Sequence, residues 1–129
     1  RHMAKINFII FCNDVKQEAN KNLNAIGIFD TIVAEKFTAV HKQMFVVVNF
    51  DISSGPHKEF FKISRNGEAV LTSEEFDFNV PGDKHQFIHR IDGLNLPEPG
   101  KYKVEIFIDG KLEGDNYFLV GNKQKINYA

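Results

Sequence analysis

The stretch LPEPGKYKVEIFIDGK, residues 96–111, predicts a β-strand that ends in a tight hairpin turn. Pro97 and Pro99 lack backbone donors, so the strand is expected to begin only after them. From there apolar and polar residues alternate with the period of two that directs one set toward a core. The apolar set is Tyr102, Val104, Ile106 and Ile108. Asp109-Gly110 then suits a two-residue type I′ turn, which predicts that the chain returns as a second strand.

Similar patterns recur along the chain and predict an all-β protein. Asn66-Gly67 is a second two-residue hairpin signal, and Gly27 inside another β-like run indicates a bulge. Further strands are predicted at residues 5–12, 25–34, 43–52, 58–65, from 68 onward, 76–80 and 85–91. Short, evenly spaced strands without an amphipathic helix favour an antiparallel, immunoglobulin-like β-sandwich of about eight strands.

The length of 129 residues fits one domain, which we expect to span residues 4–121. Residues 1–3 resemble a cloning scar with an initiator methionine, and no secretory leader follows them. The polar tail at residues 122–129 is expected to fray. Residues 13–24 form the longest polar connection before the core strands, and they are either a solvated crossover between the two sheets or a loop that carries function.

Charge and cysteine content limit the classes of partner. Sixteen Lys and Arg residues against 17 Asp and Glu give a net charge of −1, so no global positive field would attract nucleic acid. No apolar run approaches the ~20 residues that a membrane-spanning helix requires. The single cysteine, Cys12, cannot form an intrachain disulfide, which fits a reducing compartment. These features predict a cytoplasmic protein that binds neither nucleic acid nor membrane.

Two histidines four residues apart, His85 and His89, resemble a zinc-binding pair. On a strand they would lie roughly 13 Å apart, too far for both rings to approach one ion at ~2.1 Å. His41 or His57 would have to complete the site from another strand, whereas zinc sites usually contain close ligand pairs. We therefore expect partly exposed strand histidines and no metal.

Paired carboxylates are a second candidate for chemistry. Glu75 and Asp77, with Glu74 beside them, alternate with phenylalanines, which places them on the solvent-facing side of a strand. Acid–base catalysis would require one of them to be desolvated. Cys12 continues an apolar alternation and has no activating neighbour, which favours a small buried side chain over a nucleophile. The sequence therefore predicts no catalytic residue and no cofactor.

Thirteen phenylalanines without a tryptophan are the other unusual feature. Phe45, Phe107 and either Phe60 or Phe61 fall on strand faces opposite the main apolar sets, so they are expected to point outward. Charged neighbours would give Phe107 the apolar centre and charged rim of a modest protein interface. The predicted interaction surface comprises Phe107, Lys103, Glu105 and Phe45.

These features together favour a non-catalytic interaction or structural module whose partner is another protein or a second copy of the chain. A sandwich that binds a small ligand or a carbohydrate is the alternative, although sugar sites usually stack on exposed aromatic rings and tryptophan is absent. A third possibility is a metal-dependent hydrolase built from Glu75, Asp77, His85 and His89.

Two segments, FCNDVKQEANKNLNAIGIFDTI near the start and LNLPEPGKYKVEIFIDG near the end, resemble a family of short bacterial proteins known only as a domain of unknown function. The similarity spans about residues 5–120. It rests on Cys12 with Asp14, on GIFD at residues 27–30, and on the Pro-Gly-x-Tyr motif that ends at Tyr102. The resemblance implies an immunoglobulin-like sandwich with no assigned activity or catalytic residue.

Overall fold

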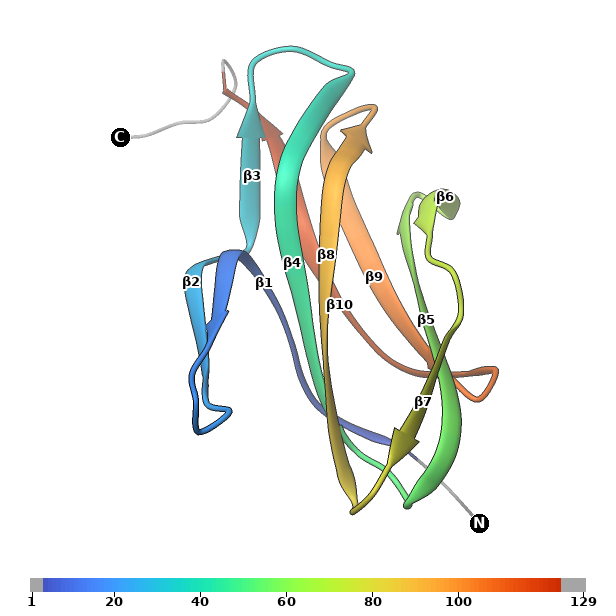
Figure 1. Ribbon diagram of the computed structural model, residues 1–129. Helices are drawn as coiled ribbons and strands as arrows, with labels where there is room; N and C mark the ends of the chain where they lie inside the picture. The colour runs from blue at the N-terminus through green and yellow to red at the C-terminus, as the bar shows by residue number, and fades with distance from the viewer. Residues whose placement is uncertain (1–3, 124–129) are drawn as a thin grey trace.

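The computed structural model describes residues 4–123 as ten strands in two sheets that pack face to face (Figure 1). The strands are β1 (Lys5–Gln17), β2 (Leu23–Phe29), β3 (Thr31–Ala34), β4 (Ala39–Asp51), β5 (Gly55–Arg65), β6 (Glu68–Thr72), β7 (Phe76–Val80), β8 (Lys84–Leu96), β9 (Gly100–Ile108) and β10 (Lys111–Asn122). The prediction of an all-β protein is confirmed. Among these residues there is no helix with the length and hydropathy needed to cross a membrane.

The two sheets differ in size and in strand order. The four-stranded sheet has the order β2-β1-β4-β8, and the six-stranded sheet has the order β3-β10-β9-β5-β6, with β7 also paired to β5. Neighbouring strands are antiparallel except β10 and β3, which are parallel. The expectation of a wholly antiparallel sandwich is therefore wrong at this one pair, which lies at a sheet edge.

Both predicted two-residue hairpin turns are present. Asn66-Gly67 joins β5 to β6, and Asp109-Gly110 joins β9 to β10. All four residues have positive φ angles, 50° and 78° in the first turn and 52° and 80° in the second. Two successive left-handed residues define a type I′ turn, which Asn-Gly and Asp-Gly favour because glycine has no Cβ to clash.

The middle of the core comes from β4 and β9. Alternate β4 residues from Met44 to Phe50 are fully buried, and alternate β9 residues from Tyr102 to Ile108 are at most 1% exposed. Both sets belong to one hydrophobic cluster that spans the two sheets. Each large apolar side chain buried in this way stabilises the fold by about 1.5–3 kcal/mol. The alternation predicted for β9 is confirmed.

The structure has ten strands where about eight were expected. The run at residues 25–34, predicted as one strand, is divided between β2 and β3, which belong to different sheets. The polar segment at residues 13–24 is neither a loop nor a crossover, because it forms the β1–β2 hairpin, closed by a hydrogen bond from the Glu18 N–H to the Asn22 carbonyl at 2.9 Å. Since β1 pairs with β4 only as far as Cys12, the rest of this hairpin extends beyond the sheet as a two-stranded arm.

The first strand departs from its expected alternation at a bulge between Ile6 and Phe8. A bulge inserts one residue and reverses which side chains face the core. Beyond it Ile9 and Phe11 are 6% and 2% exposed, whereas Phe8 is 40% exposed. Beyond the bulge, the inward residues of β1 are therefore the opposite set from the one that a continuous alternation from Ile6 predicts, whereas Ile6 itself packs against the core.

Cys12 is fully buried, as predicted, but it lies on the outer face of the four-stranded sheet, in register with Phe45 of β4. Burial, together with the Asp14 carboxylate, raises the pKa of its thiol. A nucleophilic cysteine requires the opposite shift. This environment fits the predicted role of a small apolar side chain.

The chain ends lie partly outside the described residues. Asn122, the first residue of the predicted tail, is the last residue of β10 and pairs with Ala34 of β3. The rest of that tail from residue 124 and the predicted cloning scar at residues 1–3 fall outside the described part of the chain.

His57 connects the β9–β10 turn to the segment before β5. Its Nδ1 lies 2.6 Å from Asp109 Oδ2, and its Nε2 lies 2.8 Å from the Ser53 carbonyl oxygen. A carbonyl can only accept, so Nε2 carries a proton, and the carboxylate favours a second proton on Nδ1. Asp109 Oδ1 also accepts a hydrogen bond from the Lys58 backbone N–H at 3.0 Å. The turn residue therefore holds the buried ring at one end of the core, and the ring is an imidazolium when the pH is below its pKa.

Burial of the ring is the largest single influence on the pKa of His57, and it lowers that pKa. The hydrogen bonds to Asp109 and Ser53, with the charge of Asp109, outweigh burial and raise the pKa above its ordinary value of 6.5. A pKa that is raised in the folded state contributes stability that is complete below the ordinary value. This contribution is lost as the pH rises through the folded-state pKa.

The substitution Asp109→Asn isolates this contribution, because Asn-Gly also suits a type I′ turn. We expect it to lower the free energy of unfolding by about 1–2 kcal/mol below pH ~6.5, since a half-exposed charged hydrogen bond is lost. The difference from the native protein should shrink as the pH rises through the folded-state pKa. Urea unfolding followed by circular dichroism across this pH range measures both effects. An equal loss at every pH would contradict the imidazolium.

Candidate functional site

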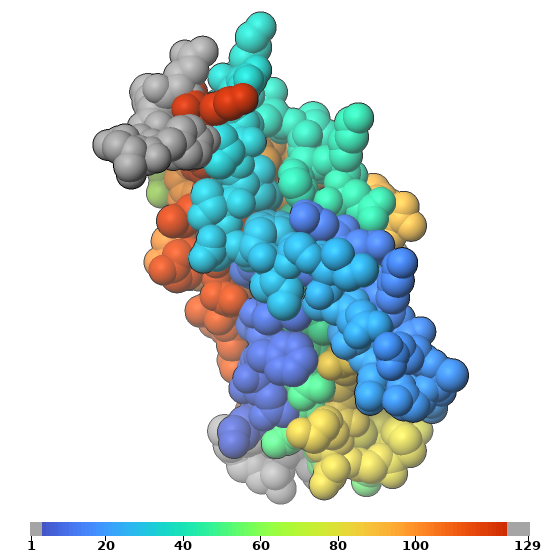
Figure 2. Space-filling model, turned by 90° about the vertical axis from the view of Figure 1, so that its left-hand side faces the viewer, coloured from blue at the N-terminus to red at the C-terminus, as the bar shows by residue number. Residues whose placement is uncertain are grey.

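One lateral side of the sandwich is open, because neither sheet continues across it. Among the described residues, 5–10 of β1 pair only with β4, and 111–118 of β10 pair only with β9. Figure 2 looks onto this side, where β1 and β2 in blue lie beside β10 in red, with β3 in cyan. We call the region framed by β1, β2, β3 and β10 the open side.

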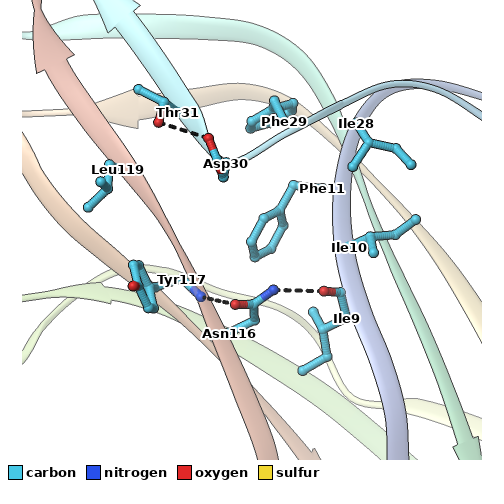
Figure 3. Close-up of a pocket in the computed structure, with 10 residues that line it drawn as sticks. All are labelled: Ile9, Ile10, Phe11, Ile28, Phe29, Asp30, Thr31, Asn116, Tyr117 and Leu119. Carbon is cyan, nitrogen blue, oxygen red and sulfur yellow. Dashed lines mark hydrogen bonds between the residues drawn. The ribbon is translucent and has the colours of Figure 1, made fainter.

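Contacts made by Gly114 and Asn116 of β10 help to join the sheets across the open side. Gly114 of β10 lies so close to β1 that an added Cβ would come within 2.7 Å of Ile6 Cγ1. Nearby, Asn116 Nδ2 donates a hydrogen bond to the Ile9 carbonyl at 2.7 Å, and Asn116 Oδ1 accepts one from the Tyr117 backbone N–H at 2.9 Å (Figure 3). Close packing at Gly114 and the Asn116 side-chain hydrogen bond thus replace the backbone hydrogen bonds that would join β1 and β10 in a continuous sheet.

A recess of about 700 Å³ opens beside the Asn116 link (Figure 3). Phe11 lies at its base, where the ring is 2% exposed and meets the Phe118 ring edge-on at a centroid distance of 5.3 Å. Ile28 of β2 and Leu119 of β10, which are 62% and 45% exposed, line it from the two sheets. We call this the first recess, and it combines an apolar base with a wide mouth.

A second recess of similar volume continues along the same side. It is lined by Ala4, by β1 from Lys5 to Ile9 and by β10 from Glu113 to Asn116. Ile9 and Asn116 line both recesses, so their hydrogen bond divides one groove into two parts.

Exposed apolar side chains concentrate on the strands around this groove. Of nine large hydrophobic side chains that are exposed within residues 4–123, seven belong to β1, β2, β3 or β10. The seven are Phe8, Ile26, Ile28, Val33, Leu112, Tyr117 and Leu119. Four of them, Phe8, Ile28, Tyr117 and Leu119, line the groove itself. Single exposed apolar residues are ordinary, but several around one opening are typical of an interaction surface.

The interaction surface predicted from the sequence lies elsewhere and is divided. Phe107 is half-buried on the outer face of the six-stranded sheet, where it stacks on Phe60 with ring centroids 4.6 Å apart. Lys103 and Glu105 form an ion pair on the same strand, with an N–O distance of 3.9 Å. Phe45 lies on the outer face of the other sheet, so it cannot share a surface with Phe107. Of the two candidate phenylalanines in β5, Phe60 is the outward one.

The four residues considered for a metal-dependent hydrolase do not converge. Glu75 and Asp77 are exposed, and their oxygens lie 3.9 and 3.7 Å from the Lys58 ammonium, as expected for a solvent-facing strand side. His85 is half-buried, but His89 is only 6% exposed, so the expectation of a partly exposed residue is wrong for His89. Within residues 4–123, no cluster of three or more His, Cys, Asp or Glu residues could hold a metal ion.

His41, the other histidine considered as a ligand, is half-buried, and its Nε2 is buried without a hydrogen-bond partner in the described chain. Its ring lies 6.0 Å from that of Phe29. Burial lowers the pKa of His41, so the ring favours its neutral form inside the sandwich.

The carboxylate that meets His89 is Glu59, which the sequence patterns did not single out. It is fully buried, and its Oε2 lies 2.8 Å from His89 Nε2. The His89 ring is surrounded by those of Phe61, Phe76 and Phe87, at centroid distances of 4.7, 5.2 and 5.0 Å. The sequence did contain one indication that Glu59 is buried. It lies two residues before the buried Phe61 on β5, and alternate strand residues point to the same face.

Removing the Asn116 amide tests how the open side is held together. Asn116→Ala deletes the donor to the Ile9 carbonyl, so we expect the free energy of unfolding to fall by about 1 kcal/mol. Asn116→Asp retains an acceptor for the Tyr117 N–H but cannot donate to Ile9, so it should be destabilised similarly near neutral pH. Chemical denaturation of both variants measures the effect. Full stability in both would show that the link is dispensable.

Comparison with solved structures finds partial likeness at low sequence identity. The chain is similar to part of the Pseudomonas fluorescens alkylpurine DNA glycosylase AlkC bound to DNA containing an abasic site analog, with TM-score 0.53 and 11% identity over 92% of this chain and 30% of that one. It is also similar to part of the Listeria innocua β-glucosidase in complex with isofagomine, with TM-score 0.50 and 9% identity over 95% of this chain and 16% of that one. The chain spans less than a third of either enzyme, and the likeness concerns the fold alone.

Comparison with curated proteins finds no match. A family model described as a family of unknown function (DUF6941) matches residues 7–121. This match covers both segments that carry the resemblance noted in the sequence. It includes eight of the ten strands entirely, and most of β1 and β10. The chain therefore belongs to this family of unknown function, DUF6941.

Proposed function

We propose that the protein is a non-catalytic interaction module that binds a protein partner through the open side. The observation that carries this proposal is the concentration of seven exposed apolar side chains on the four strands around one groove. Water contact with such a surface is unfavourable, and a partner that covers it gains stability in proportion to the apolar area buried.

Within residues 4–123, the side chains considered for catalysis do not come together, which supports a binding role over an enzymatic one. Glu75 and Asp77 lie on the solvent-exposed side of the chain beside Lys58. Glu59 and His89 are hydrogen-bonded to each other and buried in the core. A general base must reach the proton that it removes, and a buried residue enclosed by aromatic rings does not meet this requirement.

A carbohydrate ligand is a weaker candidate than a protein partner. Sugars usually stack on exposed aromatic faces, and among the described residues the exposed aromatic side chains of the open side are Phe8 and Tyr117. The Lys101 ammonium lies 4.1 Å from the centroid of the Tyr117 ring, in a cation–π contact. A sugar would have to displace this lysine from that face or use the other face of the ring.

An immunoglobulin-like assignment of the sandwich is part of this proposal. It is supported by Tyr102 near the start of β9, whose hydroxyl donates to the Glu98 carbonyl four residues earlier at 2.5 Å. A tyrosine that bonds back to the preceding backbone at a strand start is a recurring feature of immunoglobulin-like domains. A bacterial origin and a cytoplasmic location, the latter based on the single cysteine, remain predictions.

The double variant Ile28→Ser/Leu119→Ser tests the open side directly. Both side chains are about half exposed or more, so the fold should survive while the apolar surface is interrupted. We expect a partner cross-linked to the native protein in its source cells to be lost from the variant. The matched control is Val40→Ser/Ile88→Ser, which removes exposed apolar residues away from the open side. Equal recovery with both double variants would refute the proposed surface.

Phe107→Ser tests the surface predicted from the sequence. Loss of stacking on Phe60 should reduce the free energy of unfolding by about 1–2 kcal/mol without unfolding the protein. If this face is used, the mass measured by light scattering or the recovery of a partner should also fall. Unchanged mass and unchanged partner recovery would remove Phe107 from the interaction surface.

A further inference from the structure

We infer that the open side binds a segment of a partner protein that presents an apolar side chain next to a lysine or arginine. This inference rests on the proposed function and adds the chemistry of the partner. The apolar requirement comes from the first recess, where Phe11 and Phe29 lie between the exposed Ile28 and Leu119 (Figure 3). An apolar anchor that fills such a recess is the usual centre of a protein interface.

The basic requirement comes from carboxylates around the groove. Asp30 lines the first recess, and Glu113 and Asp115 line the second. Of the described residues that line the second recess, Lys5 alone is cationic. None of these three carboxylates forms an ion pair with another residue between positions 4 and 123. A second cation, the Lys101 ammonium, lies over the Tyr117 ring at the first recess. Three carboxylates therefore face two ammonium groups among the described residues, which leaves an excess of one negative charge beside the apolar base.

Many carboxylates on other parts of the sandwich have cationic partners. Nitrogen–oxygen distances are 2.9 Å for Lys84 with Asp51, 3.1 Å for Arg90 with Asp92 and 3.2 Å for Lys123 with Glu35. An interface gains specificity when opposite charges meet at its rim, and like charges there disfavour a partner. The unpaired carboxylates of the groove thus select a basic partner over an acidic one.

Asp30 is the best placed of these carboxylates to contact a partner cation. It is exposed, and its Oδ1 accepts a hydrogen bond from Thr31 Oγ1 at 3.0 Å. Its backbone carbonyl accepts a hydrogen bond from the Leu119 N–H at 2.8 Å, which ties the β2–β3 turn to β10. The carboxylate is therefore held beside the apolar recess before a partner arrives, which reduces the entropy lost on binding.

Selection from a displayed library of short random linear peptides on the immobilised full-length chain tests the inference. We expect the enriched sequences to place an aliphatic or aromatic residue next to Lys or Arg. For a synthetic peptide of that sequence, fluorescence anisotropy should show binding at least ~10-fold weaker to Asp30→Lys and to Ile28→Ser. Glu68→Lys and Val40→Ser, which change an exposed carboxylate and an exposed aliphatic side chain outside the groove, should bind nearly as well as the native chain.

Asp30→Asn separates charge from local structure, because its amide oxygen can still accept from Thr31. Weaker binding to this variant, with an unchanged melting temperature, supports a charge contact. Enriched peptides without a basic residue, or equal binding to Asp30→Lys and Glu68→Lys, would overturn the inference. Failure to enrich any peptide would also overturn it.

The two proposals fail in distinguishable ways. If no peptide is enriched but the Ile28→Ser/Leu119→Ser variant still loses a cross-linked partner, the segment chemistry is wrong and the interaction surface stands. If the native chain is a dimer in light scattering that Ile28→Ser dissociates, the occupant is a second copy and the inference is wrong. If neither peptides nor partners respond to the open-side variants, both proposals are wrong.

Discussion

Burial of alternate side chains from β4 and β9 in one core is the constraint on which the two-sheet arrangement depends. From Met44 to Phe50 and from Tyr102 to Ile108, these residues are at most 1% exposed, and each contributes about 1.5–3 kcal/mol. A single hydrogen bond at the edge contributes about 1 kcal/mol. The buried core residues therefore fix how the two sheets face each other. The shape of the sheet edges depends on which strand segments lack a second hydrogen-bonded neighbour.

The open side follows from this difference between a strongly packed core and weakly joined sheet edges. The strands β1 and β10 carry core residues on one face, but each has a segment without a second strand neighbour. Gly114 and Asn116 bring the two segments together without joining them into one sheet, which leaves recesses above and below a single side-chain hydrogen bond. Continuous backbone hydrogen bonding between β1 and β10 would have closed the groove. The groove therefore exists because these two strands are not paired.

In contrast to the exposed open side, several polar residues are buried inside the sandwich and hydrogen-bonded there. His57 lies between the Asp109 carboxylate and the Ser53 carbonyl, and Glu59 meets His89 within a group of aromatic rings. Glu59 Oε1 is buried without a hydrogen-bond partner in the described chain. Such a buried pair adds little net stability over an apolar core, but breaking it leaves an uncompensated polar group. These contacts therefore favour one arrangement of β5 against β8 and the β9–β10 turn.

The sequence by itself determined the strands with clean alternation and the two turns with left-handed residues, because both depend on local backbone geometry and neighbouring side chains. It did not determine that residues 25–34 divide between two sheets, that a bulge reverses the inward set of β1, or that Glu59 lies beside His89. Tyr117 and Leu119 could be recognised as apolar residues opposite a buried set, but Ile28 is nearly 90 positions away along the chain. Only the packing of the two sheets places these residues around one groove, because contacts between distant strands depend on topology and register, which no local pattern encodes.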